Sequence, residues 1–211
     1  MKYPAFKRFA YIVCRILIRT LYRVEIAGPY QHISGPAIVI ANHRHAFDVV
    51  AVHTAVKPWI YWVAKKELFN KSLSGEIVRR LGCIPVDRDH VDIIAARGIF
   101  GHLRKGEIVG IFPQGTRVSD DMIDSIAPHT GAAHFAIKTG VPLIPVGIDR
   151  PFRLFRKVRV VFGEPFTLEA DPRRHYTPEE LDGFALVQMQ KIFSLIGIEY
   201  HGGGIKRKKI S

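Results

Sequence analysis

The 211-residue chain has few cysteines, few acidic side chains and no long apolar run. Its two cysteines, Cys14 and Cys83, have neither metal-ligand nor redox spacing, which excludes a disulfide framework and indicates a reduced, cytosol-facing protein. No segment reaches the roughly 18 consecutive apolar residues expected of a membrane-spanning helix. The N-terminus is also a poor signal peptide, because Arg15 and Arg19 interrupt its apolar core.

The shortage of acidic residues leaves a strongly basic chain. Lys and Arg number 31 against 19 Asp and Glu, a formal net charge of +12. Such a surface favours a polyanionic partner, either nucleic acid or an anionic membrane. No helix-turn-helix, zinc or RNA-recognition signature occurs, and the basic residues concentrate at both termini. A nucleic-acid-binding module is therefore the more distant alternative, and an anionic membrane is the favoured partner.

Residues 5–21 predict an amphipathic helix. Arginines spaced by seven and four make a basic stripe: Arg8, Arg15, Arg19 and Arg23. Apolar side chains fall mainly on another face: Phe6, Phe9, Ala10, Val13, Leu17 and Leu21. Such a helix suits the membrane interface, and the alternative is a terminal helix packed on its own domain. We divide the chain into this helix (1–24), a main domain (25–200) and a basic tail (201–211), which is flexible or a second lipid contact.

Short apolar runs alternate with helical patterns along the main domain. Strands are expected at 22–26, 36–41, 59–64, 107–112, 142–147 and 157–162, and helices at 47–56, 71–81, 90–104, 130–139 and 178–196. This alternation predicts an α/β fold with a largely parallel or mixed central sheet flanked by helices. Several strands are apolar nearly throughout, which fits burial on both faces.

The most informative motif runs from Asn42 to Asp48, directly after a strand-like run. Imidazole titrates near neutral pH, so His43 could take a proton from a hydroxyl, and Asp48 could hold its tautomer. The motif also fits a loop histidine that caps the next helix, or a metal site that includes His45 and further ligands. No Gly-x-Ser-x-Gly elbow of a serine hydrolase is present.

Three further motifs follow the same logic. The turn from Gly110 to Arg117 ends a buried-strand pattern, and its arginine offers N–H donors suited to phosphate. Arg88 follows a short strand at another possible anion site, although an ordinary Asp87–Arg88 pair would also close this loop. The run 141–148 contains two prolines, which predict an edge or bent strand that lines an apolar slot or simply packs in the core.

In their order along the chain, these four motifs resemble the blocks of the glycerolipid acyltransferase family, over about residues 36–165. The resemblance implies a glycerol-3-phosphate acyltransferase-like fold, with His43 as general base and Asp48 as its partner. It assigns the acceptor's phosphate to Arg88, Phe112, Pro113, Gln114, Gly115, Thr116 and Arg117. It assigns an acyl-donor channel to Val141, Pro142, Ile144 and Pro145.

The resemblance implies an O-acyltransferase of phospholipid biosynthesis. The acyl group would pass from acyl-CoA or acyl-ACP to a lysophospholipid hydroxyl, with 1-acylglycerol-3-phosphate as the expected acceptor and phosphatidic acid as product. Neither a metal nor an organic cofactor is expected, and the protein would sit on the cytoplasmic face of a membrane, peripheral or monotopic. Gln114 stands where the family usually has glutamate, and His129 where lysine is frequent. These departures leave open another lysolipid acceptor or a catalytically weak lipid-binding protein.

Overall fold

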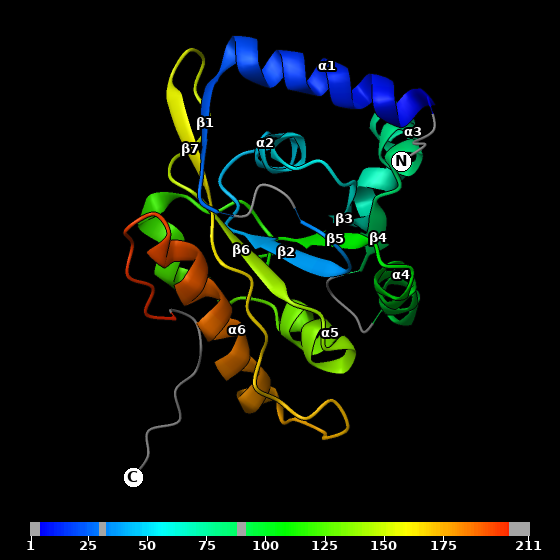
Figure 1. Cartoon of the computed structure of the whole chain (residues 1–211), viewed down its shortest axis with the longest axis vertical. Helices are drawn as coiled ribbons and strands as arrows, with labels where there is room; N and C mark the ends of the chain where they lie inside the picture. The colour runs from blue at the N-terminus through cyan, green and yellow to red at the C-terminus, as the bar shows by residue number, and fades with distance from the viewer. Residues whose placement is uncertain (1–4, 30–32, 88–91, 203–211) are drawn as a thin grey trace.

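The computed structural model describes residues 5–29, 33–87 and 92–202 and is built on a seven-stranded sheet (Figure 1). The strand order is β1-β7-β6-β2-β5-β3-β4, and neighbours are parallel except for the antiparallel pair β6 and β7. The predicted α/β fold with a largely parallel or mixed sheet is therefore confirmed. The strands are β1 (Arg23–Ala27), β2 (Ala37–Ala41), β3 (Ile60–Lys65), β4 (Ile84–Val86), β5 (Ile108–Ile111), β6 (Leu143–Ile148) and β7 (Lys157–Phe162).

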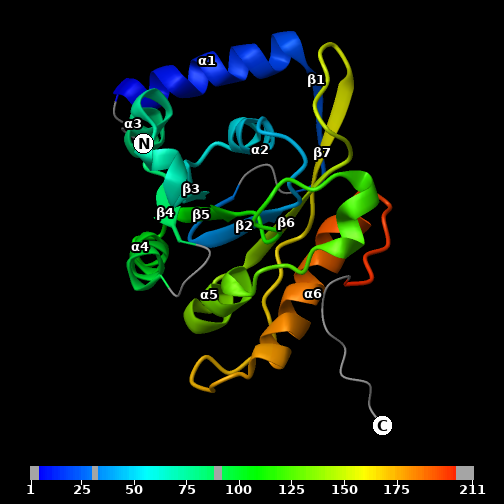
Figure 2. The same cartoon turned by 180° about the vertical axis from the view of Figure 1, so that it is seen from behind.

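Helices cover both faces of the sheet (Figures 1 and 2). One face carries α1 (Ala5–Leu21) and α2 (Asp48–Ala55), and α3 (Ser72–Leu81) lies beside α1. The other face carries α4 (Ile93–Arg104), α5 (Gly131–Thr139) and α6 (Pro178–Ser194). Two short 3₁₀ helices, η1 (Lys66–Asn70) and η2 (Asp120–Ser125), were not expected from the sequence.

The central strand β2 shows why its sequence is apolar without interruption. Its five residues are all buried. Side chains alternate across a strand, so Val39 packs in the cluster with α1 and α2, and Ile38 and Ile40 pack in the cluster with α4, α5 and α6. Both faces of β2 therefore belong to the core, and its carboxyl end is held rigidly from both sides.

The two prolines at 142 and 145 do not mark an edge strand, so the edge alternative is wrong. β6 lies inside the sheet, between β2 and β7. The carbonyl of Pro145 faces the β7 side and accepts the N–H of Gly163 at 2.9 Å, just past the end of β7. Because the ladder with β7 covers only Val146–Ile148, the missing N–H of Pro145 falls where no strand partner requires a donor.

Helix α1 packs along the domain through one side and exposes the other. Lys7 and Ile18 are buried, whereas Phe9, Ile12 and Ile16 are exposed. The predicted boundary at residue 24 falls inside β1, because the strand begins two residues after the helix ends. None of the helices in the described parts of the chain is long and apolar enough to cross a membrane.

Candidate active site

The His43 and Asp48 side chains meet at the carboxyl end of β2. Nδ1 of His43 lies 2.8 Å from Oδ2 of Asp48. The carboxylate is fully buried, whereas the imidazole keeps 18% of its side-chain surface exposed. A carboxylate only accepts hydrogen bonds, so it places the proton on Nδ1 and leaves Nε2 as the basic atom. The predicted pair is therefore assembled with the geometry of a general base and its orienting partner.

Asp48 is fixed by the loop that it closes. Its Oδ2 also accepts the backbone N–H groups of Arg44, at 2.6 Å, and His45, at 2.7 Å. Asp48 is the first residue of α2, where the positive end of the helix dipole favours a negative charge. The five-residue spacing thus follows from a tight loop wrapped around one carboxylate oxygen, rather than from a helical turn.

An aromatic stack holds the imidazole from one side. The ring of Phe112, which follows β5, lies parallel to that of His43 with centroids 4.2 Å apart. The ring of Trp62 in β3 stacks behind Phe112 at 4.9 Å. β2 and β5 are neighbouring parallel strands whose carboxyl ends place His43 and Phe112 side by side, and Trp62 supports the stack from within β3. Such packing restricts the ring to one orientation.

Gln114 connects the turn after β5 to the loop that carries His43 and Asp48. Its Oε1 accepts the backbone N–H of His43 at 3.0 Å, and its side chain is buried. The carbonyl of His43 in turn accepts the N–H of Val118 at 2.8 Å. The oxygen that binds the backbone of His43 is present in glutamine as well as in glutamate, so the replacement of the family's usual glutamate keeps this contact.

The turn itself depends on Gly115, whose φ is +67°. A Cβ at this position would lie 2.4 Å from Nε2 of His129. The N–H of His129 also binds the carbonyl of Pro113 at 2.8 Å, so the histidine packs directly against the turn. Of the two departures from the family pattern, His129 is thus the one whose side chain fills the space beside Gly115.

An open hollow lies over this turn. Its volume is about 470 Å³, and Lys65, Gln114, Gly115 and Thr116 are among its lining residues. Thr116 and Arg117 are exposed, so their polar groups are accessible to an anion. Lys65, the last residue of β3, was not singled out as a binding residue from the sequence. Its adjacency to the turn is visible only once β3 and β5 are paired. Arg88, the other predicted phosphate ligand, lies outside the described residues.

A second, larger cavity shares Gly115 of the turn with this hollow, and His43 is not part of its lining. Its volume is about 510 Å³, and Phe112 and Gly115 form one end of its lining. The rest of the wall comes from β3, β4, α4, α5 and α6, and includes Val63, Val86, Ala96, Ile99, Phe135 and Leu181. The cavity is thus largely apolar and begins beside the ring that stacks on His43.

The fourth motif lies in and just before β6, in the core. Ile144 packs in the cluster with α1 and α2, and Val141 packs in the opposite cluster. Pro142 precedes the strand and Pro145 is buried within it. Among the described residues, these four line neither the 470 Å³ nor the 510 Å³ cavity. Their acyl-donor role stays a prediction, because other residues line the apolar cavity.

Two residues of the first motif have roles that the sequence did not reveal. The side-chain amide of Asn42 replaces a missing strand partner, because it donates to the carbonyl of Ile148 at 2.9 Å and accepts its N–H at 2.7 Å. The almost buried guanidinium of Arg44 forms an ion pair with Asp120 of η2. The loop from Asn42 to Asp48 is thereby tied to the end of β6 and to the segment after the Gly110–Arg117 turn.

The structure brings no further metal ligands to His43 and His45 within the described residues. Nδ1 of His45 accepts the N–H of Phe47 at 3.3 Å. Across residues 5–29, 33–87 and 92–202, no three or more His, Cys, Asp or Glu side chains gather as metal ligands would.

With this geometry in place, comparison with known proteins decides the family. The family model described as Acyltransferase matches residues 23–149, more than half of the chain. The chain belongs to this acyltransferase family. The resemblance drawn from the motifs is confirmed, and residues 23–149 include the His43–Asp48 pair and the whole turn from Gly110 to Arg117.

Relatives support the same assignment. The 1-acyl-sn-glycerol-3-phosphate acyltransferase of Bacillus subtilis (strain 168) is 32% identical over 134 residues, 61% of this chain and 65% of that protein. The protein of that name from Escherichia coli (strain K12) is 35% identical over 133 residues, 60% of this chain and 53% of that protein. The human alpha form is 27% identical over 206 residues, 91% of this chain and 72% of that protein. The alignments thus span about half to two thirds of the length of the bacterial relatives.

The acyltransferase fold is matched by a crystal structure. The 1-acyl-sn-glycerophosphate acyltransferase of Thermotoga maritima superposes with a TM-score of 0.63 at 22% sequence identity. The match covers 92% of this chain and 83% of that one. At this identity the likeness establishes the fold, so substrates and mechanism must come from the site.

Proposed function

We propose that this acyltransferase moves a fatty acyl group from an acyl thioester to the free hydroxyl of 1-acylglycerol-3-phosphate and so forms phosphatidic acid. The observation that carries the proposal is the buried Asp48 carboxylate against the exposed edge of His43, beside a turn whose Arg117 is accessible. The names of the relatives support the same acceptor. Coenzyme A or acyl carrier protein would supply the thioester as co-substrate.

The chemistry needs one base. Nε2 of His43 removes the proton as the acceptor oxygen attacks the thioester carbonyl carbon, and Asp48 stabilises the imidazolium that forms. When the tetrahedral intermediate collapses, the C–S bond breaks and the imidazolium returns its proton to the leaving thiolate. Proton transfer by a positioned group contributes about 10²–10⁴-fold in rate. No acyl-enzyme is required, because an alcohol activated in this way attacks directly.

The two hollows differ in chemistry, and we assign one to the acceptor's phosphate and the other to a hydrocarbon chain. The turn with Arg117 and Thr116, together with Lys65, would hold the acceptor's phosphate, because guanidinium and ammonium groups bind phosphate oxygens with charge-assisted hydrogen bonds. The largely apolar 510 Å³ cavity, which starts at Phe112, would receive a hydrocarbon chain. Gly115 lines both hollows, and Gln114 next to it binds the backbone N–H of His43, so the two substrates would be held on one turn beside the proposed base.

Helix α1 would bring the enzyme to its acceptor. At 100° per residue, Phe9, Ile12 and Ile16 share the side turned away from the domain, and their side chains are exposed. Arginines line one flank of that face: Arg8, Arg15 and Arg19. An exposed apolar face with cations at its border fits the headgroup level of an anionic membrane, where each Lys or Arg is worth about 1 kcal/mol. We propose peripheral or monotopic attachment through this face.

An acyl-transfer assay of the purified protein tests the function. Lysophosphatidic acid and other lysolipids are supplied with acyl-CoA and acyl-ACP, and the products are analysed by mass spectrometry. We expect phosphatidic acid from the wild-type protein and a loss of at least 10²-fold in His43→Ala. His175→Ala, which removes an exposed histidine far along the chain, is the matched control. Near-normal turnover in His43→Ala would refute the mechanism, and a different preferred lysolipid would correct the acceptor.

A further inference from the structure

The segment between β6 and β7 ends in a tight turn that exposes two large apolar side chains. The N–H of Arg156 binds the carbonyl of Arg153 at 3.0 Å, which puts Leu154 and Phe155 at the two central positions of the turn. Their side chains are 59% and 69% exposed. Neither residue belongs to either core cluster, so their apolar surface does not contribute to the packing of the domain.

The backbone conformation at Phe155 is unusual for an aromatic residue. Phe155 has a φ of +59°, and among the described residues it is the one non-glycine residue with positive φ. This region favours glycine or asparagine, and a bulky side chain there is strained. The backbone of Phe155 is strained and its ring is in contact with water, so the ring adds no burial energy that would offset the strain. Such an outlier indicates that the ring serves something outside the domain.

Cations surround the exposed pair. Arg150 and Lys157 form ion pairs with Asp149 and Glu25. Arg153 and Arg156, which bracket the apolar tip, are exposed and form no ion pair within the described residues. An apolar tip between two uncompensated arginines is complementary to a surface with anionic headgroups over hydrocarbon.

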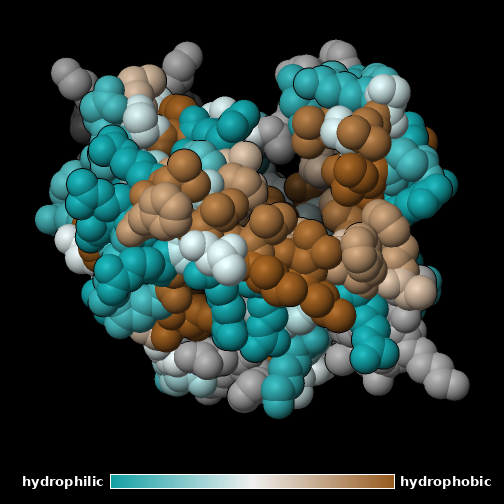
Figure 3. Space-filling model, turned by 90° about the horizontal axis from the view of Figure 1, so that it is seen from above, coloured by the Kyte–Doolittle hydropathy of each residue, from teal (hydrophilic) through white to brown (hydrophobic). Residues whose placement is uncertain are grey.

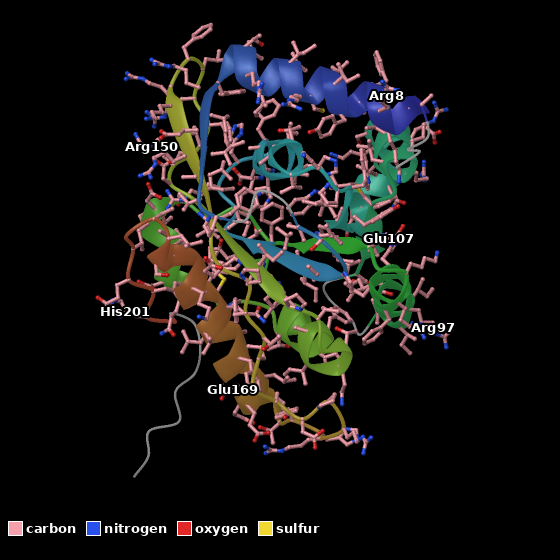
Figure 4. The ribbon with its side chains drawn as sticks, in the orientation of Figure 1. Arg8, Arg97, Glu107, Arg150, Glu169 and His201 are labelled. Atoms are coloured by element: carbon pink, nitrogen blue, oxygen red, sulfur yellow. The ribbon has the colours of Figure 1, made fainter. Side chains whose placement is uncertain are left out.

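The turn continues the outer face of α1. The N–H of Phe155 binds the carbonyl of Leu21, the last residue of α1, at 2.8 Å. In Figure 1 the segment before β7 rises to the level of α1, and from above, the side on which α1 lies, apolar residues form a broad band between hydrophilic ones (Figure 3). Arg8 and Arg150 extend outward from opposite parts of the molecule (Figure 4).

We propose that the Arg153–Arg156 turn is a second membrane anchor, which inserts Leu154 and Phe155 into an anionic bilayer beside α1. A domain attached to the membrane through α1 alone could rotate about the axis of that helix. A second attachment at the turn would fix the orientation of the domain on the membrane. The inference rests on the proposed function, because an acceptor held in a bilayer requires the catalytic loop to face the membrane in one orientation.

The turn is also mechanically joined to the catalytic loop. Phe152, in the same segment, is buried, and its ring lies 5.8 Å from that of His45 and 5.2 Å from that of Tyr22. His45 lies between His43 and Asp48 in the chain, and the segment begins just after Ile148, which the side chain of Asn42 holds. Membrane contact at the turn would therefore place the His43 loop at a defined height above the bilayer.

Insertion can be measured directly with Phe155→Trp. The native tryptophans, Trp59 and Trp62, are buried, so a new indole at the turn gives the signal that changes. On addition of vesicles made of phosphatidylglycerol and phosphatidylcholine in equal parts, we expect a blue shift and quenching by lipids spin-labelled on the acyl chain. An emission spectrum that stays solvent-like while the protein sediments with the vesicles would overturn the proposal.

A double variant tests the energetic contribution of the turn. Leu154→Ser with Phe155→Gly removes the apolar surface and relieves the positive φ, so the protein should be at least as stable as the wild type. We expect vesicle affinity to fall about tenfold or more. Ile94→Ser, at a residue that is 79% exposed on α4, which covers the opposite face of the sheet, is the control and should bind as the wild type does. Unchanged binding of the double variant would contradict the proposal.

The outcome is separable from that of the proposed function. The double variant should keep its rate with a short-chain lysophosphatidic acid presented as monomers, and lose rate with the same headgroup embedded in vesicles. If the wild-type protein transfers no acyl group to any acceptor, the proposed function fails, while the vesicle measurements still decide whether the turn is an anchor.

Discussion

The side-chain oxygen of Gln114 accepts the backbone N–H of His43 at 3.0 Å, which joins the turn proposed to bind phosphate to the proposed general base. The two residues are 71 positions apart and follow neighbouring strands, β5 and β2. The bond holds the backbone of His43 against the turn. The glutamine that stands in place of the family's usual glutamate preserves this contact with His43.

Removal of that contact should lower kcat. In Gln114→Ala the N–H of His43 loses its acceptor in a buried place, which costs about 1–3 kcal/mol, so we expect a tenfold or larger loss in kcat with lysophosphatidic acid. Gln114→Glu keeps an acceptor oxygen and should retain much more of the rate. Steady-state kinetics of both, with the exposed Gln190→Ala as control, check this. Equal losses in the alanine and glutamate variants would contradict it.

Asp48→Asn tests the tautomer argument. The amide can replace a carboxylate oxygen as acceptor for the loop N–H groups, but it supplies no negative charge to stabilise the imidazolium. We expect kcat to fall by about 10²-fold or more with KM for both substrates little changed. Retention of wild-type kcat would show that the carboxylate serves only to close the loop.

The sequence predicted where the site lies in the fold, but it did not predict most of the contacts within the site. His43 and Phe112 follow apolar runs, and parallel buried strands end at one edge of a sheet, so their convergence was foreseeable. The partner of Gln114 and the adjacency of Lys65 depend on strand order and register, which periodicity does not fix. Pro145 misled for the same reason, because its tolerance depends on where β7 ends.

Arg117 and Lys65 should affect the acceptor more than the donor. Both adjoin the hollow or turn proposed for the phosphate, so replacing either by alanine removes a charge-assisted hydrogen bond worth about 1.5–3 kcal/mol. We expect a tenfold or larger rise in KM for lysophosphatidic acid and little change in KM for acyl-CoA. Arg97→Ala, an exposed arginine of α4, is the control. Equal effects on both substrates would exclude the phosphate role.

Gly115→Ala should disrupt the turn through His129. The added methyl would lie 2.4 Å from the imidazole, and the φ of +67° adds strain. We expect a large loss in kcat/KM for the acceptor, and partial recovery in the double variant Gly115→Ala with His129→Ala, which relieves the collision but not the strain. A double variant no more active than Gly115→Ala alone would show that the collision is not the cause.

His53 should make stability depend on pH. It lies in α2 against Trp59, with ring centroids 4.3 Å apart, and its Nδ1 is buried without a hydrogen-bond partner among the described residues. Burial, with a smaller effect from the nearby positive charge of Lys7, lowers the pKa of His53 from 6.5 to about 4. The folded protein therefore keeps this imidazole neutral at the interface of α1 and α2.

The sign of this dependence follows from proton binding. Between pH 6.5 and about 4 the unfolded chain protonates His53 and the folded protein does not, so the free energy of unfolding falls as the pH decreases through that range. The full shift corresponds to about 3 kcal/mol. His53→Phe, which keeps a flat ring, should be less sensitive to pH over this window in urea unfolding, whereas His175→Phe at an exposed site should behave as the wild type. If wild-type and His53→Phe proteins lose stability in parallel, other groups dominate and His53 is already solvated in the folded state.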